Sequence, residues 1–244
     1  MGTVVTITSG KGGTGKTSIT GGIAASLALM GRRVLCIDMD IGLRNLDISL
    51  GLSDRALMDF SDVAEGRCPL VRAAGNHPDL PGLALLTAPM TLSPALTEEA
   101  VRRMLDTARS LYDYVLIDSP AGLGAGFRMA CCGADRAIVV STNDASSLRD
   151  AQRTVGELDF LRQIHLVMNR IQPKLLRQLR TTIDDAMDAA GLPLLGIVPE
   201  DPQVMLCANR EQPLILYANR GAATAYLNIA KRLLGQKAPL MRLR

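Results

Sequence analysis

Aromatic residues are scarce in this chain of 244 residues, which has no Trp, three Phe and four Tyr. Histidine is equally rare, with His77 and His165 as the only two. His77 precedes Pro78, where a loop is expected, and His165 lies in an apolar segment. Because neither has a partner spaced for metal or triad chemistry, we expect no catalytic or metal-binding histidine.

Cysteine pairs with metal-ligand spacing are also missing. The five cysteines are at positions 36, 68, 131, 132 and 207, an odd number without a C-x-x-C pair. This usage is typical of a reduced cytosolic chain. We expect the adjacent Cys131 and Cys132 to pack as small buried hydrophobes. An iron–sulfur carrier would need cysteines spaced for a shared cluster, so this function is disfavoured.

The chain lacks long apolar runs and a large excess of charge. No segment approaches the roughly 18 uncharged apolar residues of a membrane-spanning helix. We expect no signal peptide, because the first apolar strand begins within the first few residues. The net charge is only +3, and no basic cluster is longer than two residues, as in Arg102-Arg103. Nucleic acid is therefore disfavoured as a partner. With 48% hydrophobic and 21% charged residues, we expect a globular, cytoplasmic protein.

A glycine-rich phosphate loop is the most specific motif that the chain does contain. Residues 10–17 read Gly-Lys-Gly-Gly-Thr-Gly-Lys-Thr, a full match to G-x-x-x-x-G-K-[ST]. The loop follows the apolar run 4–8 and precedes the helix-like segment 19–30, which is the context the motif requires. The sequence therefore predicts a nucleoside triphosphate site.

The residue types of this loop suit phosphate chemistry. Glycines let successive backbone N–H groups converge on phosphate oxygens, and the following helix directs its positive end to the same place. Lys16 is expected to neutralise the β- and γ-phosphates, and Thr17 to place its hydroxyl on Mg²⁺. The residues predicted to contact ATP or ADP here are Gly10, Lys11, Gly12, Gly13, Thr14, Gly15, Lys16, Thr17 and Ser18.

A dinucleotide-binding fingerprint competes for the same residues. Gly10, Gly12 and Gly15 also fit G-x-G-x-x-G, and Asp38 ends the next apolar run. That alternative does not require Lys16-Thr17, nor Asp118 at the end of a later apolar run. A magnesium nucleotide site uses both, because a hydrophobic strand ending in Asp is the Walker B pattern that holds the water shell of the metal.

Apolar runs alternate with helical patterns along the chain. Near-continuous apolar strands of this kind predict a mainly parallel sheet of about seven strands, buried on both faces by helices. We therefore predict a three-layer α/β P-loop NTPase fold and a single domain over 1–244, with a short tail at 235–244. The predicted strands are 3–8, 34–37, 83–86, 114–117, 137–140, 164–168 and 194–198, and the predicted helices are 17–30, 97–111, 145–161, 174–190 and 222–234.

With its additional lysine, Lys11, the loop resembles the deviant Walker A box that defines the MinD/ParA ATPases. Segment 38–47 is similar to switch I of the MinD members, and segment 118–122 to their Walker B and switch II. Shorter similarities at 65–67, 146–150 and 198–201 extend the resemblance over nearly the whole chain.

This resemblance implies roles for particular residues. In the family, two ATP-loaded subunits face each other, and the residue matching Lys11 reaches the phosphates of the partner. Asp40 would orient or activate the attacking water, although a loop residue exposed by chance is the alternative. The implied catalytic residues are Lys11, Lys16 and Asp40; the implied metal-side residues are Thr17, Asp38 and Asp118; the implied adenine contacts are Asn169, Arg170, Pro199, Glu200 and Asp201.

The resemblance also implies a biological role. The expected function is an ATPase that is slow without a partner, dimerises with ATP and Mg²⁺, and acts in division-site placement. Its implied partners are a MinC-like inhibitor and a MinE-like or other activator. A ParA-type partition ATPase that binds DNA nonspecifically is the alternative.

The C-terminal segment departs from the MinD pattern of a terminal amphipathic helix. Pro239 discourages a continuous helix, and Leu240, Met241 and Leu243 alternate with Arg242 and Arg244. This pattern would give weak attraction to an anionic membrane surface. Peripheral attachment at the inner face of the cell membrane therefore stays open as an addition to a cytoplasmic location.

Overall fold

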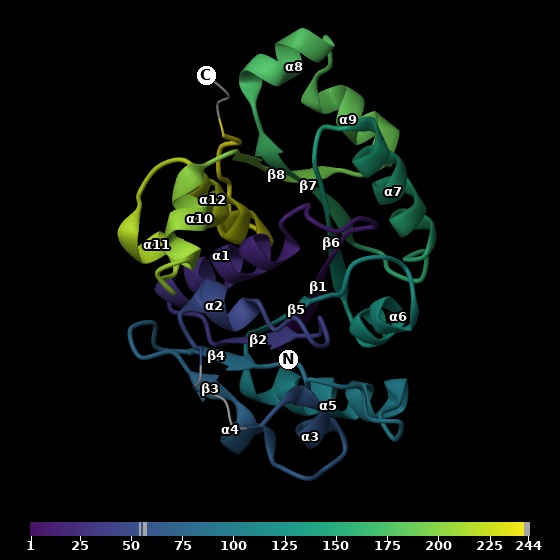
Figure 1. Ribbon diagram of the computed structural model, residues 1–244, viewed down its shortest axis with the longest axis vertical. Coiled ribbons are helices and arrows are strands. Elements are labelled where there is room, and N and C mark those ends of the chain that lie inside the picture. Colours follow the sequence, from purple (N-terminus) through teal and green to yellow (C-terminus); the bar gives the residue numbers. More distant parts are fainter. Residues whose placement is uncertain (54, 56–57, 242–244) are drawn as a thin grey trace.

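An eight-stranded sheet forms the middle layer of the computed structural model, which describes residues 1–53, 55 and 58–241 (Figure 1). The strand order is β3-β4-β2-β5-β1-β6-β7-β8, and all neighbours are parallel except β3 and β4. The strands are β1 (Thr3–Thr8), β2 (Val34–Asp38), β3 (Gly75–Asn76), β4 (Leu83–Leu86), β5 (Tyr114–Asp118), β6 (Arg136–Ser141), β7 (Ile164–Ile171) and β8 (Leu194–Pro199).

Helices cover both faces of the sheet, which explains why the strands are apolar on both sides. Val4 and Val5 of β1 illustrate this, because they belong to core clusters on opposite faces. One face packs against α1 (Lys16–Leu29), α2 (Leu46–Leu50), α10 (Pro202–Ala208), α11 (Leu214–Tyr217) and α12 (Ala222–Leu233). The other packs against α3 (Phe60–Ala64), α4 (Leu70–Ala73), α5 (Glu98–Leu111), α6 (Ala125–Cys131), α7 (Ala145–Gly156), α8 (Pro173–Leu179) and α9 (Ile183–Ala190).

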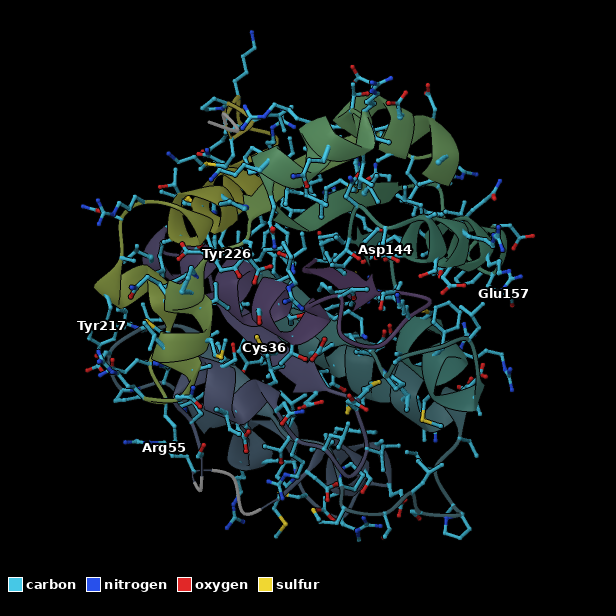
Figure 2. All side chains as sticks on the ribbon, turned by 45° about the horizontal axis from the view of Figure 1, so that its top comes forward. Cys36, Arg55, Asp144, Glu157, Tyr217 and Tyr226 are labelled. Atoms are coloured by element: carbon cyan, nitrogen blue, oxygen red, sulfur yellow. The ribbon has the colours of Figure 1, made fainter. Side chains whose placement is uncertain are left out.

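Helix α1 is buried by its neighbours because small residues let them approach closely. Gly22 lies directly against the ring of Tyr226 on α12, where a Cβ would clash with the ring. Tyr226, labelled in Figure 2, is only 2% exposed. This packing fixes the start of α1 at the carboxyl end of β1, where the phosphate loop leaves the sheet.

The predicted three-layer α/β fold and all seven predicted strands are confirmed. The eighth strand, β3, is a two-residue antiparallel addition at the edge of the sheet, too short to leave a periodic signal in the sequence. The predicted helix 145–161 ends earlier, at Gly156.

The single helix predicted over 174–190 was wrong. Helix α8 ends at Leu179, and the following residue, Arg180, has a left-handed φ of 53°. Thr182 then begins α9 with a capping box, because its side chain accepts from the backbone N–H of Asp185 while the Asp185 carboxylate accepts from that of Thr182. Thr182 and Asp185 have the spacing of such a box, a local stop and start signal that outweighed the continuous helical periodicity.

His77, Cys131 and Cys132 are buried in the fold. His77 is buried and its Nδ1 accepts from the backbone N–H groups of Asp79 and Leu80. Burial raises the pKa of Cys131 to about 12 and that of Cys132 to about 11, which keeps both thiols protonated and unreactive.

The two ends of the described chain differ in how they are held. Met1 is fully exposed, whereas Met241 packs against the core. The tail residues Arg242, Leu243 and Arg244 lie outside the described residues. Within the described part of the chain, no helix combines the length and the apolar character needed to cross a membrane.

Candidate active site

The phosphate loop connects β1 to α1 and depends on glycines with left-handed backbone conformations. Gly13 has a φ of 79° and Gly15 a φ of 89°, values that disfavour any residue with a Cβ. At Gly15 the Asn169 amide occupies the position that a Cβ would need. The loop therefore presents open space around Gly13 and places the first backbone N–H groups of α1 at its rim.

Lys16 supplies a buried positive charge at the centre of the site. Its side chain is 8% exposed, and its Nζ donates to the hydroxyl of Ser9 at 3.1 Å. Burial lowers the pKa of Lys16, while the nearby charges of Asp118 and Asp40 oppose that shift. Ser9 precedes the motif and was not predicted as a site residue; no pattern in the sequence marks it.

The two predicted metal-side carboxylates lie next to each other on neighbouring strands. Asp38 ends β2 and Asp118 ends β5, and they are direct partners in the parallel register. Thr17 donates its hydroxyl to Asp118 at 2.6 Å, and Thr20 donates to the same carboxylate at 3.3 Å. Asp38 accepts from the backbone N–H groups of Asp40 at 2.9 Å and of Leu46 at 3.2 Å.

Both carboxyl groups resist ionisation because they are buried. Burial raises the pKa of Asp118 to about 7; the Thr17 hydrogen bond opposes this, and the charge of Asp38 adds to it. Burial likewise raises the pKa of Asp38 to about 6, against the hydrogen bonds that it accepts from the backbone. A divalent cation near these groups would favour their charged forms.

The donor set fits Mg²⁺ that is bound together with a nucleotide. The described residues include no group of three or more His, Cys, Asp and Glu side chains that could hold a metal alone. Mg²⁺ is usually bound through few protein oxygens, with phosphate and water completing its coordination. Thr17, Asp38 and Asp118 would supply those oxygens directly or through water, beside the ammonium of Lys16.

Asp40 follows β2 and lies near both Asp38 and Lys16. Its side chain is partly buried, and burial raises its pKa while the charge of Lys16 lowers it. The backbone of Asp40 donates to Asp38, and its carbonyl accepts from Leu43 in a tight turn. Asp40 is therefore a partly buried neighbour of the lysine rather than a freely exposed loop residue.

The signature lysine, Lys11, is held within its own subunit. Its Nζ lies 3.2 Å from Asp144 and 2.9 Å from the hydroxyl of Ser146. Asp144 begins α7 (Figure 2) and also accepts from Thr142 and from the backbone of Ser147. Burial favours the neutral acid, but hydrogen bonds from Ser146, Thr142, Ser147 and Lys11 hold the pKa of Asp144 well below its usual range. The sequence did not predict Asp144 as a site residue.

The residues predicted around adenine lie at the carboxyl ends of β7 and β8. Asn169 donates its side-chain amide to the carbonyl of Thr14 at 2.7 Å. Arg170 forms an ion pair with Glu200 at 2.8 Å and donates to the carbonyl of Gly13 at 3.5 Å. These contacts join the phosphate loop to the two strand ends, and the contact of these residues with adenine stays a prediction.

Asp201 has a structural position, and Pro199 ends β8 beside it. The Asp201 carboxylate caps α10 by accepting a hydrogen bond from the backbone N–H of Gln203. It also accepts from the backbone N–H of Ala222, the first residue of α12. Both carboxylate oxygens therefore accept hydrogen bonds at helix starts.

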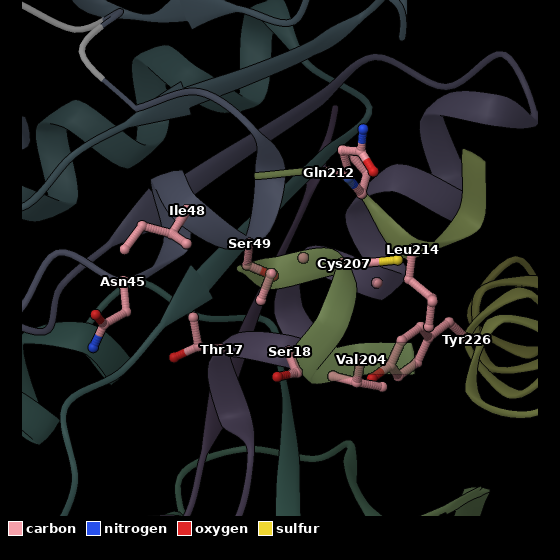
Figure 3. A pocket seen from close by; sticks show the side chains of 14 residues that line it. Thr17, Ser18, Asn45, Ile48, Ser49, Val204, Cys207, Gln212, Leu214 and Tyr226 are labelled. Carbon is pink, nitrogen blue, oxygen red and sulfur yellow. The ribbon is translucent and has the colours of Figure 1, made fainter. Parts of the chain in front are cut away.

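Two cavities flank the phosphate loop. One, of about 330 Å³, contains Lys11, Asp144, Arg170 and Glu200 in its wall. The other, of about 290 Å³, lies between α1 and α10 and is shown in Figure 3. Its wall includes Thr17, Ser18, Ser49, Val204, Cys207 and Tyr226. Thr17 and Ser18, which follow Lys16 directly, belong to this wall, so the second cavity opens beside the start of α1.

Comparisons with known proteins agree with this geometry. Residues 5–214 match the CobQ/CobB/MinD/ParA nucleotide binding domain family. The chain is 40% identical over 246 residues to the septum site-determining protein MinD of Bacillus subtilis, covering 98% of this chain and 92% of that protein.

Solved structures show the same similarity. The chain matches the MinC:MinD cell division protein complex of Aquifex aeolicus with a TM-score of 0.91 and 37% identity, covering 98% of both chains. It matches the septum site-determining protein MinD of Pyrococcus horikoshii, which is complexed with Mg-ADP, with a TM-score of 0.83 and 28% identity, covering 96% of both chains.

The replacement Asp118→Asn should stabilise the protein without nucleotide and weaken its use of magnesium. In the unfolded chain Asp118 ionises near pH 4, whereas in the fold it holds its proton up to about pH 7. The folded state therefore binds the extra proton in this window, and wild-type stability falls as pH rises through it. The neutral amide of the variant carries no such penalty.

Urea unfolding in EDTA at pH 5 and pH 8 measures this effect. The stability gain of the variant should be larger at pH 8 than at pH 5 by roughly 2 kcal/mol. Mg²⁺ should also increase the ADP affinity of the variant less than that of the wild type. A gain that is the same at both pH values would show that Asp118 does not titrate in this window.

Proposed function

Since this chain belongs to the CobQ/CobB/MinD/ParA family of nucleotide-binding domains, we propose that it is a MinD-type ATP switch that acts in division-site placement. The observation that carries the proposal is the phosphate loop with two lysines, Lys11 and Lys16, beside the paired carboxylates of Asp38 and Asp118. Identity of 40% to a MinD protein over nearly the full length supports the same function.

The site residues support a division of labour in ATP hydrolysis. Bound Mg²⁺ would supply charge neutralisation at the β- and γ-phosphates. Lys16 would bind those phosphates, and Thr17 and Asp118 would fix the metal side. Asp40 would orient the water that attacks the γ-phosphorus, so that the β–γ bond breaks and ADP and phosphate are released.

Hydrolysis by a single subunit should be slow, because one positive charge is missing from its phosphates. Lys11 is engaged with Asp144 and Ser146, and charge stabilisers that are absent leave most of the barrier standing. A partner that completes or rigidifies the site would accelerate the reaction. A slow reaction of this kind would let the partner determine how long the ATP-bound state lasts.

Dimerisation would replace the contacts of Lys11 with Asp144 and Ser146 by contacts with the phosphates of the partner subunit. Within one subunit its ammonium is paired with a half-exposed carboxylate, an interaction that is worth little in water. In a dimer the same ammonium would serve the phosphates of the partner, which carry more charge when the nucleotide is ATP than when it is ADP. The free energy of this exchange would make association depend on ATP.

We extend the proposal to partners and location by similarity. A MinD of Aquifex aeolicus forms a complex with MinC, which supports a MinC-like partner for this chain. A MinE-like activator, an ATP-dependent homodimer and a cytoplasmic location with weak peripheral membrane contact complete the proposal. The ParA-type alternative has less support, because the ParA family ATPase of Chlorobium tepidum, at 22% identity, shows the fold alone.

The Lys11→Ala replacement tests the exchange directly. We expect this variant to bind ADP with near wild-type affinity, but to lose ATP-dependent dimerisation and most of its ATPase activity. Light scattering with size-exclusion chromatography in Mg-ATP, together with phosphate release, measures both properties. Lys231→Ala on α12 is the matched control. Unchanged self-association and hydrolysis of Lys11→Ala would contradict the role given to Lys11.

The Asp40→Ala replacement separates binding from hydrolysis. Removing the carboxylate should leave ATP binding intact and reduce single-turnover hydrolysis at least about tenfold, because the attacking water loses its orienting group. The dimer formed in Mg-ATP should then persist longer than that of the wild type. Wild-type turnover by Asp40→Ala would remove Asp40 from the mechanism.

A further inference from the structure

A basic cavity lies at the amino ends of the strands. The phosphate loop is at the opposite, carboxyl ends. The volume of the cavity is about 540 Å³, and it is bordered by the amino ends of β5, β6, β7 and β8 and by the last turn of α12. Its polar wall consists of Tyr114, Arg136, Arg162, Gln163, His165 and Arg232. No Asp or Glu belongs to the described wall.

The arginines of this cavity are not neutralised by carboxylates. Arg136 donates to the carbonyl of Leu233 at 3.4 Å. Arg232 donates to the carbonyls of Leu195 at 3.2 Å and Ala238 at 3.1 Å. Among the described residues, neither these two arginines nor Arg162 takes part in an ion pair. The carbonyl groups accept hydrogen bonds from Arg136 and Arg232 without cancelling their charge.

The acids that directly precede Arg136 and Tyr114 are already engaged elsewhere. Asp135, beside Arg136, is paired with Arg109 at 2.6 Å. Asp113, beside Tyr114, is paired with Arg33 at 2.9 Å. The positive charge is also felt inside the cavity, because the pKa of His165 is lowered first by burial and then by Arg136. Three guanidinium groups therefore share a concave space without a counterion from the described chain.

We propose that this cavity is a binding site for a phosphate-bearing anion, with Arg136 and Arg162 as its charged contacts. Guanidinium groups match the geometry of phosphate oxygens and form charge-assisted hydrogen bonds with them. The positive charge is concentrated in a pocket rather than spread along a stripe, which fits a phosphate group better than a nucleic-acid backbone. Arg232 positions the site through its contacts with β8 and the tail.

Soluble phosphate and the phosphate of a lipid headgroup offer the same chemistry. The cavity adjoins Gly235, the first residue of the tail, and Arg232 also binds the carbonyl of Ala238. The site is therefore placed where an anion would be linked to the C-terminal segment. The two sources of phosphate are separated by experiment.

The first arm of the test uses the two histidines as reporters. The imidazole resonances of full-length protein saturated with Mg-ADP are titrated with pH, in inorganic phosphate and in chloride of equal ionic strength. Saturation keeps phosphate out of the nucleotide loop. Phosphate should raise the titration midpoint of His165 and leave buried His77 unchanged, because a bound anion offsets the nearby positive charge.

The variants give this arm its specificity. The double replacement Arg136→Gln/Arg162→Gln should weaken the phosphate effect on His165 at least about tenfold. The matched control, Arg102→Gln/Arg103→Gln on α5, removes the same charge from arginines outside the cavity and should keep the wild-type response. No phosphate-specific movement of His165, or equal movement in both double variants, would overturn the proposal.

The second arm identifies the source of the phosphate. Full-length protein is floated with vesicles of phosphatidylcholine, alone or mixed with phosphatidylglycerol. If the source is lipid, the anionic vesicles should bind the wild type and the control at least about tenfold better than the cavity variant. Equal vesicle binding by all three, together with a specific His165 response, assigns the site to soluble phosphate.

Binding of duplex DNA is measured with the same proteins. Loss of DNA binding in the cavity variant, without any effect of phosphate on His165 of the wild type, would contradict the proposal in favour of nucleic acid.

Discussion

The buried ammonium of Lys16 is the interaction on which the site depends. It has one direct hydrogen-bond acceptor in the protein among the described contacts, the neutral hydroxyl of Ser9, and its charge is balanced only by the nearby carboxylates of Asp118 and Asp40. Those carboxylates are themselves disfavoured by burial. A magnesium-bound phosphate chain would stabilise both the buried ammonium and the buried carboxylates, since its oxygens would bind the lysine and its cation would attract the acids. The charges of the ligand would therefore complement the buried charges of the protein.

A second lysine links this site to the state of the whole molecule. Lys11 is on the same loop as Lys16, but its ammonium points to Asp144 and Ser146 at the start of α7. Its exposed ion pair is weak enough to be exchanged, whereas Lys16 is buried beside Ser9. One loop thus carries one fixed cation and one exchangeable cation. A nucleotide bound at the fixed cation could therefore control where the exchangeable cation is bound, which is the physical basis of the proposed switch.

Much of this architecture could be predicted from local sequence patterns. The strand, loop, helix context of residues 3–30 identified the phosphate loop, and the apolar runs ending in Asp38 and Asp118 placed both acids at the same sheet edge. The break between α8 and α9 was missed because the Thr182–Asp185 capping box was overlooked within a helical periodicity. Ser9 and Asp144 could not be found in this way. Ser9 is outside any motif, and the contact of Asp144 with Lys11 joins residues far apart in the chain. The cavity around Arg136 and Arg162 likewise arises only when strand ends and α12 meet.

Calorimetric titration of the purified chain with ADP and Mg²⁺ tests the central claim most directly. The wild type should bind one nucleotide per subunit in a magnesium-dependent manner, and Lys16→Gln should lose at least about tenfold in affinity, because the charge-assisted contacts of the buried ammonium are removed. Thermal unfolding of both proteins without nucleotide verifies that the variant is folded. Absence of heat from the folded wild type, or equal affinity of the two proteins, would contradict a nucleotide site centred on Lys16.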